Sequence, residues 1–204
     1  MKFSDMTYTR PDLEAAKAQI QAHTKALREA KTFGEAKAAF LEMQKLESAL
    51  RTADALSYIR HTIDTRDAYY DEEARFLAEH LPLLKEDEQE FQKALLASPF
   101  RPDFEDEYGA LFLKDMEMEL KTFTPAIVPL MQRENALVLD YDQLIASAQI
   151  PFEGGVYTLS QLTPFKQDPD DDRRRAAWEA EGRFYLEHGE ELDALYDELV
   201  QVRT

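Results

Sequence analysis

Cysteine is absent from the 204 residues, which excludes disulfides, thiolate catalysis and cysteine-ligated metal. Glycine is scarce at six residues, whereas Ala, Leu, Glu, Lys and Gln, which lose little free energy on entering a helix, are abundant. No apolar run is long enough for a membrane span, and the N-terminus has no apolar core of signal-peptide length. These absences favour a mainly helical protein, and we expect it to be cytoplasmic.

Positive charge is also in short supply, and the net charge at pH 7 is −17. The lysines and arginines are spread along the chain and form no basic stripe, so the sequence predicts no nucleic-acid partner. An anionic membrane surface would repel such a chain, so we expect no membrane partner. Hydrophobic residues make up 44% of the sequence, enough for a packed core.

Capping signals and apolar spacing predict the first two helices. Asp12 follows Pro11 and opens a helix that runs to about residue 30. Thr32 and Glu35 have capping-box spacing and open the helix with the strongest apolar pattern. Its apolar residues recur every three or four positions and predict one buried stripe: Phe33, Ala36, Phe40, Met43, Leu46, Leu50 and Ala53.

The rest of the chain continues in the same way, with one exception. Helices are predicted over 67–80, 84–97, 104–123 and 133–148, with two closing helices over 168–188 and 189–204. The exception is "QIPFEGGVYTL", where a two-residue turn at Gly154-Gly155 would place Ile150 and Phe152 opposite Tyr157 and Leu159. The predicted fold class is therefore mainly α, with one small β-hairpin near residues 150–159.

The acidic stretch "HTIDTRDAYYDEEARF" is the first candidate for a site. His61, Asp64, Asp67 and Asp71 are spaced so that neighbouring pairs could share a helix face, and such a ridge could bind a hard divalent ion weakly. A strong site needs ligands from several elements or a loop around the ion. We therefore favour a solvated helix face or helix caps over a metal site.

A second candidate, "DPDDDRRRAAWE", resembles a calcium loop. Acidic residues occupy positions 1, 3, 5 and 12 of that pattern: Asp168, Asp170, Asp172 and Glu179. Arg173 stands where the loop needs glycine, and Arg175 stands at the apolar position. The sequence therefore predicts a helix capped by Asp168, with Pro169 in its first position and the arginines near the acidic residues.

Known catalytic motifs are missing from the sequence. The residues three positions before His23, His61, His80 and His188 are not glutamate, so no Glu-x-x-His pair is present. The chain also lacks H-E-x-x-H, a phosphate-binding glycine loop and a G-x-S-x-G elbow. We assign no catalytic, cofactor-binding or metal-binding residue, and the chain does not look self-sufficient as an enzyme.

Several segments nevertheless resemble, in order, the N-terminal part of bacterial oligoendopeptidases of the oligoendopeptidase F and thimet oligopeptidase family. They are "SYIRHTIDTRDAYYDEE", "LLASPFRPDFEDEYGALFLKDMEMELKTF", "RENALVLDYDQLIASAQIPFEGGVYTLSQLTPF", "RRRAAWEA" and "ELDALYDELVQVRT". The resemblance implies a soluble, mostly helical, two-lobed parent with a channel between its lobes. It also implies a zinc ion, held by H-E-x-x-H and a later glutamate, that serves the hydrolysis of short peptides.

The resemblance carries no catalytic residue to this chain. "HGEEL" at His188 is a near look-alike, but Glu190 comes one residue late and Glu191 is not histidine. We expect an N-terminal portion, inactive by itself, with a helical lobe over 1–148 and, over 149–204, a hairpin and first helices leading to a catalytic lobe. The closing helix keeps its apolar phase up to Thr204, as expected of a chain that continues. The parent would bind zinc, whereas this chain would bind none.

The alternative is a complete non-catalytic helical module that binds a peptide or a partner helix. Tyr69 and Tyr70 are possible groove residues in either case, although packing is the favoured interpretation.

Overall fold

The computed structural model describes residues 2–204, and nearly all of them lie in helices or short turns between helices. In chain order the elements are η1 (Phe3–Asp5), α1 (Leu13–Glu29), α2 (Phe33–Ile63), α3 (Ala68–His80), η2 (Leu81–Leu84), α4 (Lys85–Leu96), α5 (Arg101–Tyr108), α6 (Ala110–Thr122), η3 (Pro125–Ile127), α7 (Val128–Ala146), β1 (Ile150–Phe152), β2 (Gly155–Tyr157), α8 (Leu159–Leu162), η4 (Phe165–Gln167), α9 (Asp171–Glu187) and α10 (Gly189–Arg203). The prediction of a mainly α fold with one hairpin is confirmed. Within residues 2–204, no helix is both long and apolar enough to cross a bilayer.

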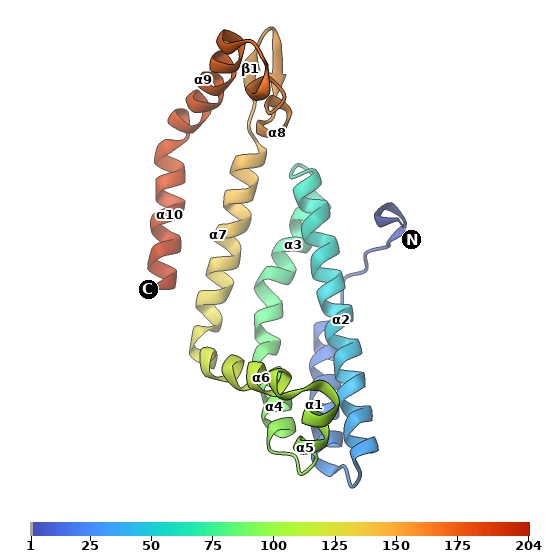
Figure 1. The fold of residues 1–204 in the computed structure, drawn as a ribbon. Coiled ribbons are helices and arrows are strands. Elements are labelled where there is room, and N and C mark those ends of the chain that lie inside the picture. The colour runs from blue at the N-terminus through green and yellow to red at the C-terminus, as the bar shows by residue number, and fades with distance from the viewer. Residues whose placement is uncertain (1) are drawn as a thin grey trace.

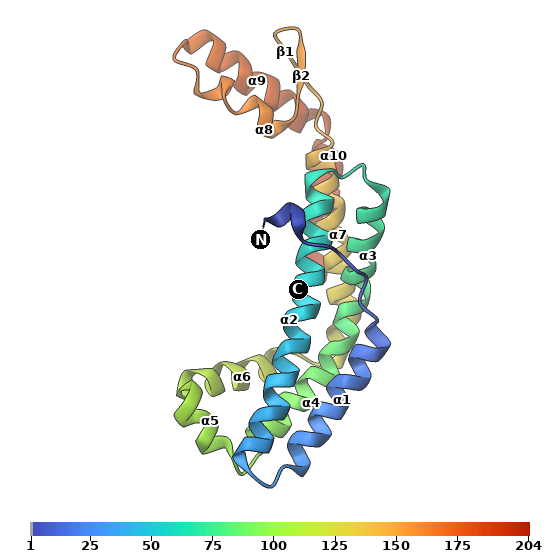
Figure 2. The ribbon, with the colours of Figure 1, turned by 90° about the vertical axis from the view of Figure 1, so that its right-hand side faces the viewer.

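The long helices form an elongated body. Helices α2, α3, α7 and α10 follow one another side by side, and α1 and α4 complete the lower end (Figure 1). At that end α5 and α6 project from the body, and at the other end the hairpin, α8 and α9 project to the same side (Figure 2). We call the side between these two projections the concave side.

Two separate clusters of apolar side chains hold the structure together. The larger lies among α1, α2, α4, α5 and α6, where the buried Phe104 ring meets Phe33 and Phe40 edge to face at 5.2 and 5.5 Å between centroids. The smaller joins the hairpin, α8 and α9 around Ile150 and Leu162. Burying such side chains stabilises each by about 1.5–3 kcal/mol, so both ends of the molecule have their own core.

The predicted N-terminal caps of α1 and α2 are present. The Asp12 carboxylate accepts a hydrogen bond from the Ala15 amide at 2.9 Å, and the Thr32 hydroxyl accepts one from the Glu35 amide at 3.3 Å. The second half of the predicted capping box differs, because the Glu35 carboxylate accepts from the Lys31 amide at 2.7 Å. Asp12 and Thr32 each satisfy an amide that the first helical turn leaves without a partner.

Two predicted helix boundaries were wrong. The helix expected over 104–123 is split into α5 and α6, because Gly109 takes φ 89° and ψ 155° between them. Only glycine adopts this backbone region readily, so one residue ends the first helix and starts the second. Helix α7 begins at Val128, well before the expected Arg133, because Pro129 lies in the first turn, where no amide donor is needed.

The hairpin was predicted, but its register was wrong. Ile150 pairs with Tyr157 and Phe152 pairs with Gly155, so the turn residues are Glu153 and Gly154, with φ of 46° and 78°. Two positive φ values suit the twist of a two-residue hairpin. Gly155 is needed for packing instead, since a Cβ there would lie 2.8 Å from the Tyr157 ring. Leu159, the expected strand residue, opens α8.

Candidate functional site

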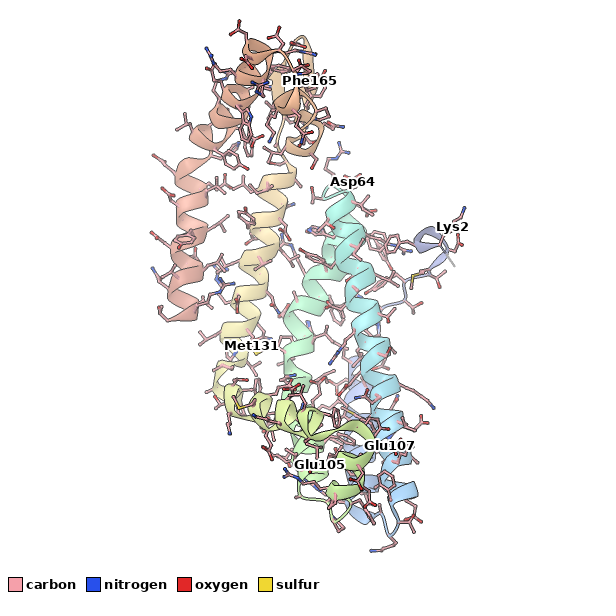
Figure 3. All side chains as sticks on the ribbon, viewed as in Figure 1. Lys2, Asp64, Glu105, Glu107, Met131 and Phe165 are labelled. Atoms are coloured by element: carbon pink, nitrogen blue, oxygen red, sulfur yellow. The ribbon has the colours of Figure 1, made fainter. Side chains whose placement is uncertain are left out.

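The acidic stretch 61–76 crosses the turn between α2 and α3, so its acidic residues do not share one helix face. Asp64 ends α2 and accepts from both the amide and the Nε of Arg66, at 3.2 and 3.0 Å. Figure 3 shows Asp64 at the upper tip of α2. Asp67 caps α3 by accepting from the Tyr69 and Tyr70 amides at 3.0 and 3.3 Å. The helix-capping interpretation is confirmed for Asp67, whereas the Asp64 carboxylate holds the turn between the helices through Arg66.

His61 and Asp71 belong to a network that joins three helices. The His61 ring is fully buried, and its Nδ1 lies 3.6 Å from Asp71 Oδ1. Arg75 contacts the same carboxylate at 3.2 Å and also donates to Asp140 of α7 at 2.9 Å. Arg75 therefore links α3 to α7 and neutralises the carboxylates of Asp71 and Asp140, whereas the two ring nitrogens of His61 have no hydrogen-bond partner within residues 2–204.

The second acidic candidate is a helix cap, although the capping residue was wrong. Asp170, and not Asp168, accepts from the Asp172 and Arg173 amides at 2.9 and 3.0 Å. Asp168 precedes the helix and accepts from the Asp170 amide and from Arg173 Nη1, at 2.9 and 2.7 Å. The Asp170 amide, followed by the arginine, lowers the pKa of the Asp168 carboxyl. Pro169 consequently lies outside α9.

Arg173 connects the start of α9 to the hairpin. Its guanidinium also donates to both carboxylate oxygens of Glu153 in the hairpin turn, at 2.8 and 2.7 Å. A bidentate pair of this kind fixes orientation as well as charge. The arginine in the position that excludes a calcium loop thus connects α9 to the hairpin.

The remaining histidine candidate offers no metal site either. His188 lies at the junction of α9 and α10, and its Nδ1 is 3.4 Å from Glu191 Oε2. Across the described residues, no group of three or more His, Asp or Glu side chains is arranged to hold a metal ion. We therefore derive no catalytic step from these side chains.

Tyr69 and Tyr70 pack against the N-terminal segment, as the favoured interpretation expected. The Tyr8 ring meets both of them edge to face, at 6.4 and 6.1 Å between centroids. Beneath this cluster the buried Glu73 carboxylate accepts from the Tyr8 hydroxyl at 2.6 Å and from Arg10 Nη2 at 2.6 Å. These contacts attach the segment before α1 to α3.

The Glu73 carboxylate is negatively charged, and this charge stabilises the attachment of the N-terminal segment to α3. The hydrogen bond from Arg10 lowers the pKa of the Glu73 carboxyl against the opposing effect of burial, and the hydrogen bond from Tyr8 adds to it. Burial and the neighbouring Glu73 charge raise the pKa of the Tyr8 hydroxyl. Glu73 is therefore an ionised acceptor at neutral pH, held by two donors from one short segment.

A cleft of about 680 Å³ lies among α2, α3, η2, α4 and α7, and no sequence pattern identified it. We call it the central cleft. Apolar side chains from α3, η2 and α7 line its wall: Ala74, Leu77, Ala78, Leu81, Pro82, Met131, Val138 and Leu139. Met131 lies near the lower end of α7 (Figure 3). Its volume falls within the range of about 300–1,000 Å³ that is usual for ligand pockets.

The polar edge of the central cleft is mostly acidic. Four carboxylates and two cations line it: Glu47, Asp54, Glu88, Glu134, Arg51 and Lys85. Burial raises the pKa of the Glu47 carboxyl, and the nearby Glu88 charge adds to the effect. Burial alone raises the pKa of the Asp54 carboxyl. Glu47 is half-buried and Asp54 is exposed at the rim of the cleft, so the neighbouring protein removes part of the water around each carboxylate.

Lys85 is the best-paired charge at this edge. Burial disfavours its ammonium form, but the hydrogen bond to Glu119 at 2.8 Å, with the contact to Glu88 at 3.3 Å, outweighs that effect and raises its pKa. Glu119 lies on α6, which projects on the concave side (Figure 2). This ion pair places the lower end of the central cleft beside that projection.

Sequence spacing could not have identified the central cleft. The apolar pattern of α3 and α7 marks the faces that turn inward, but it does not show where neighbouring helices leave space between them. The one available signal was a carboxylate, Asp54, one position after the apolar stripe of α2.

The chain was compared with protein-family models and with solved structures. The family model described as the peptidase M3 N-terminal domain matches residues 3–123. Among solved structures, PZ peptidase A with an inhibitor is 42% identical, with a TM-score of 0.94, over 100% of this chain and 36% of that chain. A protein described as an oligoendopeptidase F from Bacillus anthracis str. Ames is 41% identical, with a TM-score of 0.95, over 100% of this chain and 38% of that chain.

A further structure described as an oligoendopeptidase F is 41% identical, with a TM-score of 0.95 and the same full coverage of this chain. A search of curated protein sequences found no match. The chain spans little more than a third of the length of these solved relatives.

Proposed function

The chain belongs to the peptidase M3 N-terminal domain family, and we propose that it is the non-catalytic N-terminal lobe of a zinc-dependent oligoendopeptidase that hydrolyses short peptides. One observation carries the proposal: the whole chain superposes on the relatives at 41–42% identity and a TM-score of 0.94–0.95, yet accounts for only 36–38% of their length. The lobe would be inactive alone, and the parent would be a cytoplasmic enzyme.

Zinc chemistry in this proposal belongs to another part of the parent protein. A protein-bound zinc with an open position lowers the pKa of its water and polarises a carbonyl. The acidic candidates of this chain do not fit such a site, because arginines and backbone amides already contact their carboxylates, and no group of three or more His, Asp or Glu side chains within residues 2–204 is arranged to hold a metal. We therefore assign none of residues 2–204 to the metal or to the general base.

The concave side suits one wall of a substrate channel. The two projections lie at opposite ends of the helical body and border the same side of it (Figure 2). A catalytic lobe facing this side would enclose a channel that extended peptides can enter and folded proteins cannot. Short peptides are accordingly the proposed substrates.

An exposed apolar surface supports a contact with the catalytic lobe. Helix α10 lies at the edge of the helical body, with α7 as its main neighbour (Figure 1). Along α9 and α10, Leu186 is 83% exposed and Tyr196 is 67% exposed, and Trp178 and Val200 are exposed as well. Large apolar side chains exposed along two successive helices can take part in an interface. We propose that residues 149–204 join the helical lobe of residues 1–148 to the catalytic lobe of the same polypeptide.

The test begins with the reading frame that encodes this chain. The proposal expects in-frame sequence for a further domain, with H-E-x-x-H and a later glutamate, and zinc-dependent cleavage of short peptides by the whole product. A stop codon directly after Thr204 would contradict it and leave the alternative of a helical binding module.

A further inference from the structure

We infer that the central cleft is a binding subsite for a peptide segment in which an apolar side chain lies next to a lysine or arginine. This inference rests on the proposed function, because peptides are the ligands it assumes. To the proposed function it adds the place where this lobe contacts the peptide and the charge of the peptide side chain that is preferred there.

The apolar wall of the cleft supports the binding of an apolar peptide side chain. The side chains of Leu81, Met131 and Val138 line the cleft from η2 and α7, and Ala74 and Ala78 of α3 leave space between them. Space next to small residues can accept a Leu-sized side chain. Removing such a side chain from water contributes about 1.5–3 kcal/mol when its burial is complete.

The charged half comes from a carboxylate that lacks a counter-ion. Within residues 2–204, the Asp54 side chain makes no ion pair or hydrogen bond, and its only contact of this kind is the Ser57 hydroxyl to its backbone carbonyl. The other acidic residues are better matched, with Glu88 held by Lys85 at 3.3 Å and Glu134 by Arg203 at 2.7 Å. A cation entering the cleft would find its free partner at Asp54.

The remaining acidic group strengthens the preference. Within residues 2–204 the one ion pair of Glu47 is with Arg51, at 4.0 Å, and the Arg51 side chain is 84% exposed. That distance and exposure make the pair weak. Carboxylates therefore outnumber effective cations at the cleft edge, and an acidic peptide would meet repulsion where a basic one meets attraction.

The location fits a peptide subsite. Lys85 and its partner Glu119 connect the lower end of the cleft to α6 on the concave side. A peptide in the proposed channel would pass this opening. Contact here, away from the zinc-bearing lobe, would add substrate affinity without contacting the reacting bond.

Fluorescence anisotropy on the 204-residue chain tests the inference. The probe is a labelled, end-blocked peptide that contains Leu-Lys, and the comparison peptide has Leu-Glu in its place. We expect tighter binding of the Leu-Lys peptide. Asp54→Asn should weaken that binding about fivefold, as for a partly exposed ion pair, without weakening the Leu-Glu peptide.

Two further variants separate the cleft from general charge. Glu105→Gln removes an equal charge from the exposed surface of α5, far from the cleft (Figure 3), and should leave both affinities unchanged. Ala78→Leu fills the cleft and should weaken both peptides. Circular dichroism confirms that each variant is folded.

Three results would overturn the inference: no binding of either peptide, equal binding of both, or equal effects of Asp54→Asn and Glu105→Gln. A dimer of the chain that excludes both peptides would also overturn it. The proposed function is judged separately, by zinc-dependent hydrolysis in the whole gene product. If that hydrolysis occurs but Asp54→Asn leaves KM for Leu-Lys and Leu-Glu substrates unchanged, only the subsite is lost.

Discussion

Glu73→Gln is the most informative single change for the stability of this lobe. The Glu73 side chain is buried at 3% exposure and accepts hydrogen bonds from Tyr8 and Arg10, at 2.6–3.0 Å. Glutamine keeps the shape, but it removes the charge and points an amide donor at the guanidinium. The N-terminal segment should then separate from α3.

The expected loss of stability depends on the burial of Glu73 and on the partial exposure of its partner Arg10. Breaking a fully buried ion pair costs about 3–5 kcal/mol, because the remaining charge loses its partner. The Arg10 side chain is 38% exposed and also pairs with Glu72 at 2.9 Å, so water and Glu72 offset part of that loss. We expect the free energy of unfolding to fall by about 2 kcal/mol, near the value of a hydrogen bond to a charged group. For a chain of this size the Tm should drop by about 4–8 °C.

Urea unfolding at pH 7 measures the effect, with Glu72→Gln as the matched control. Glu72 contacts the same arginine but its side chain is 74% exposed, so its loss should leave the unfolding free energy nearly unchanged. Hydrogen exchange at residues 7–11 should rise in Glu73→Gln alone. Equal effects of the two variants would refute the argument that burial gives Glu73 its role.

The pH dependence provides a second check on the same pair. The folded pKa of Glu73 lies below its ordinary value of 4.5, so the stability it contributes is present above that value. It is lost as the pH falls through the folded pKa. The difference between wild type and Glu73→Gln should therefore be constant from pH 7 to about 5 and shrink at lower pH. A difference that grows on acidification would contradict the assigned charge state.

The remaining predictions concern the fold. Gly109→Ala should destabilise the chain by about 1–3 kcal/mol through backbone strain alone, because no atom lies within 4 Å of the added Cβ; an unchanged urea midpoint would contradict this. Asp170→Ala should cost about 1 kcal/mol in urea unfolding through loss of the α9 cap, whereas an equal loss in Asp171→Ala would show that the cap is not the cause. Leu95→Ala in the larger core should cost about 2–5 kcal/mol by the same measurement, and a loss below about 1 kcal/mol would mean that the site collapses around the cavity.

Local chemistry made much of the fold predictable from the sequence. Asp12, Thr32 and Asp67 cap helices near the expected positions, since a side-chain oxygen next to free amides acts within a few residues. One error arose where a distant partner decided the outcome, whereas those at Gly109 and Pro129 came from local backbone preferences. Glu153 has a positive φ in the hairpin turn. Its carboxylate is bound there by Arg173, which lies twenty residues later in the sequence. No local pattern contains that contact.

The central cleft could not be predicted for a similar reason. Its wall combines residues from α2, α3, η2, α4 and α7, and its existence depends on how those helices cross. Periodicity identified the buried stripe of α2, but Asp54 becomes notable only when no cation is found beside it. Conversely, the acidic runs that attracted attention in the sequence are caps and ion pairs in the structure.

Peptide hydrolysis by the whole gene product is the measurement that decides whether this chain is the non-catalytic lobe of a zinc peptidase. A quenched fluorescent short peptide would be incubated with that product and, in parallel, with the 204-residue chain, each before and after treatment with a metal chelator. We expect the whole product to cleave the peptide, the chelator to abolish and zinc to restore that cleavage, and the 204-residue chain to cleave nothing. Cleavage by the 204-residue chain alone, or cleavage by the whole product that is insensitive to the chelator, would contradict it.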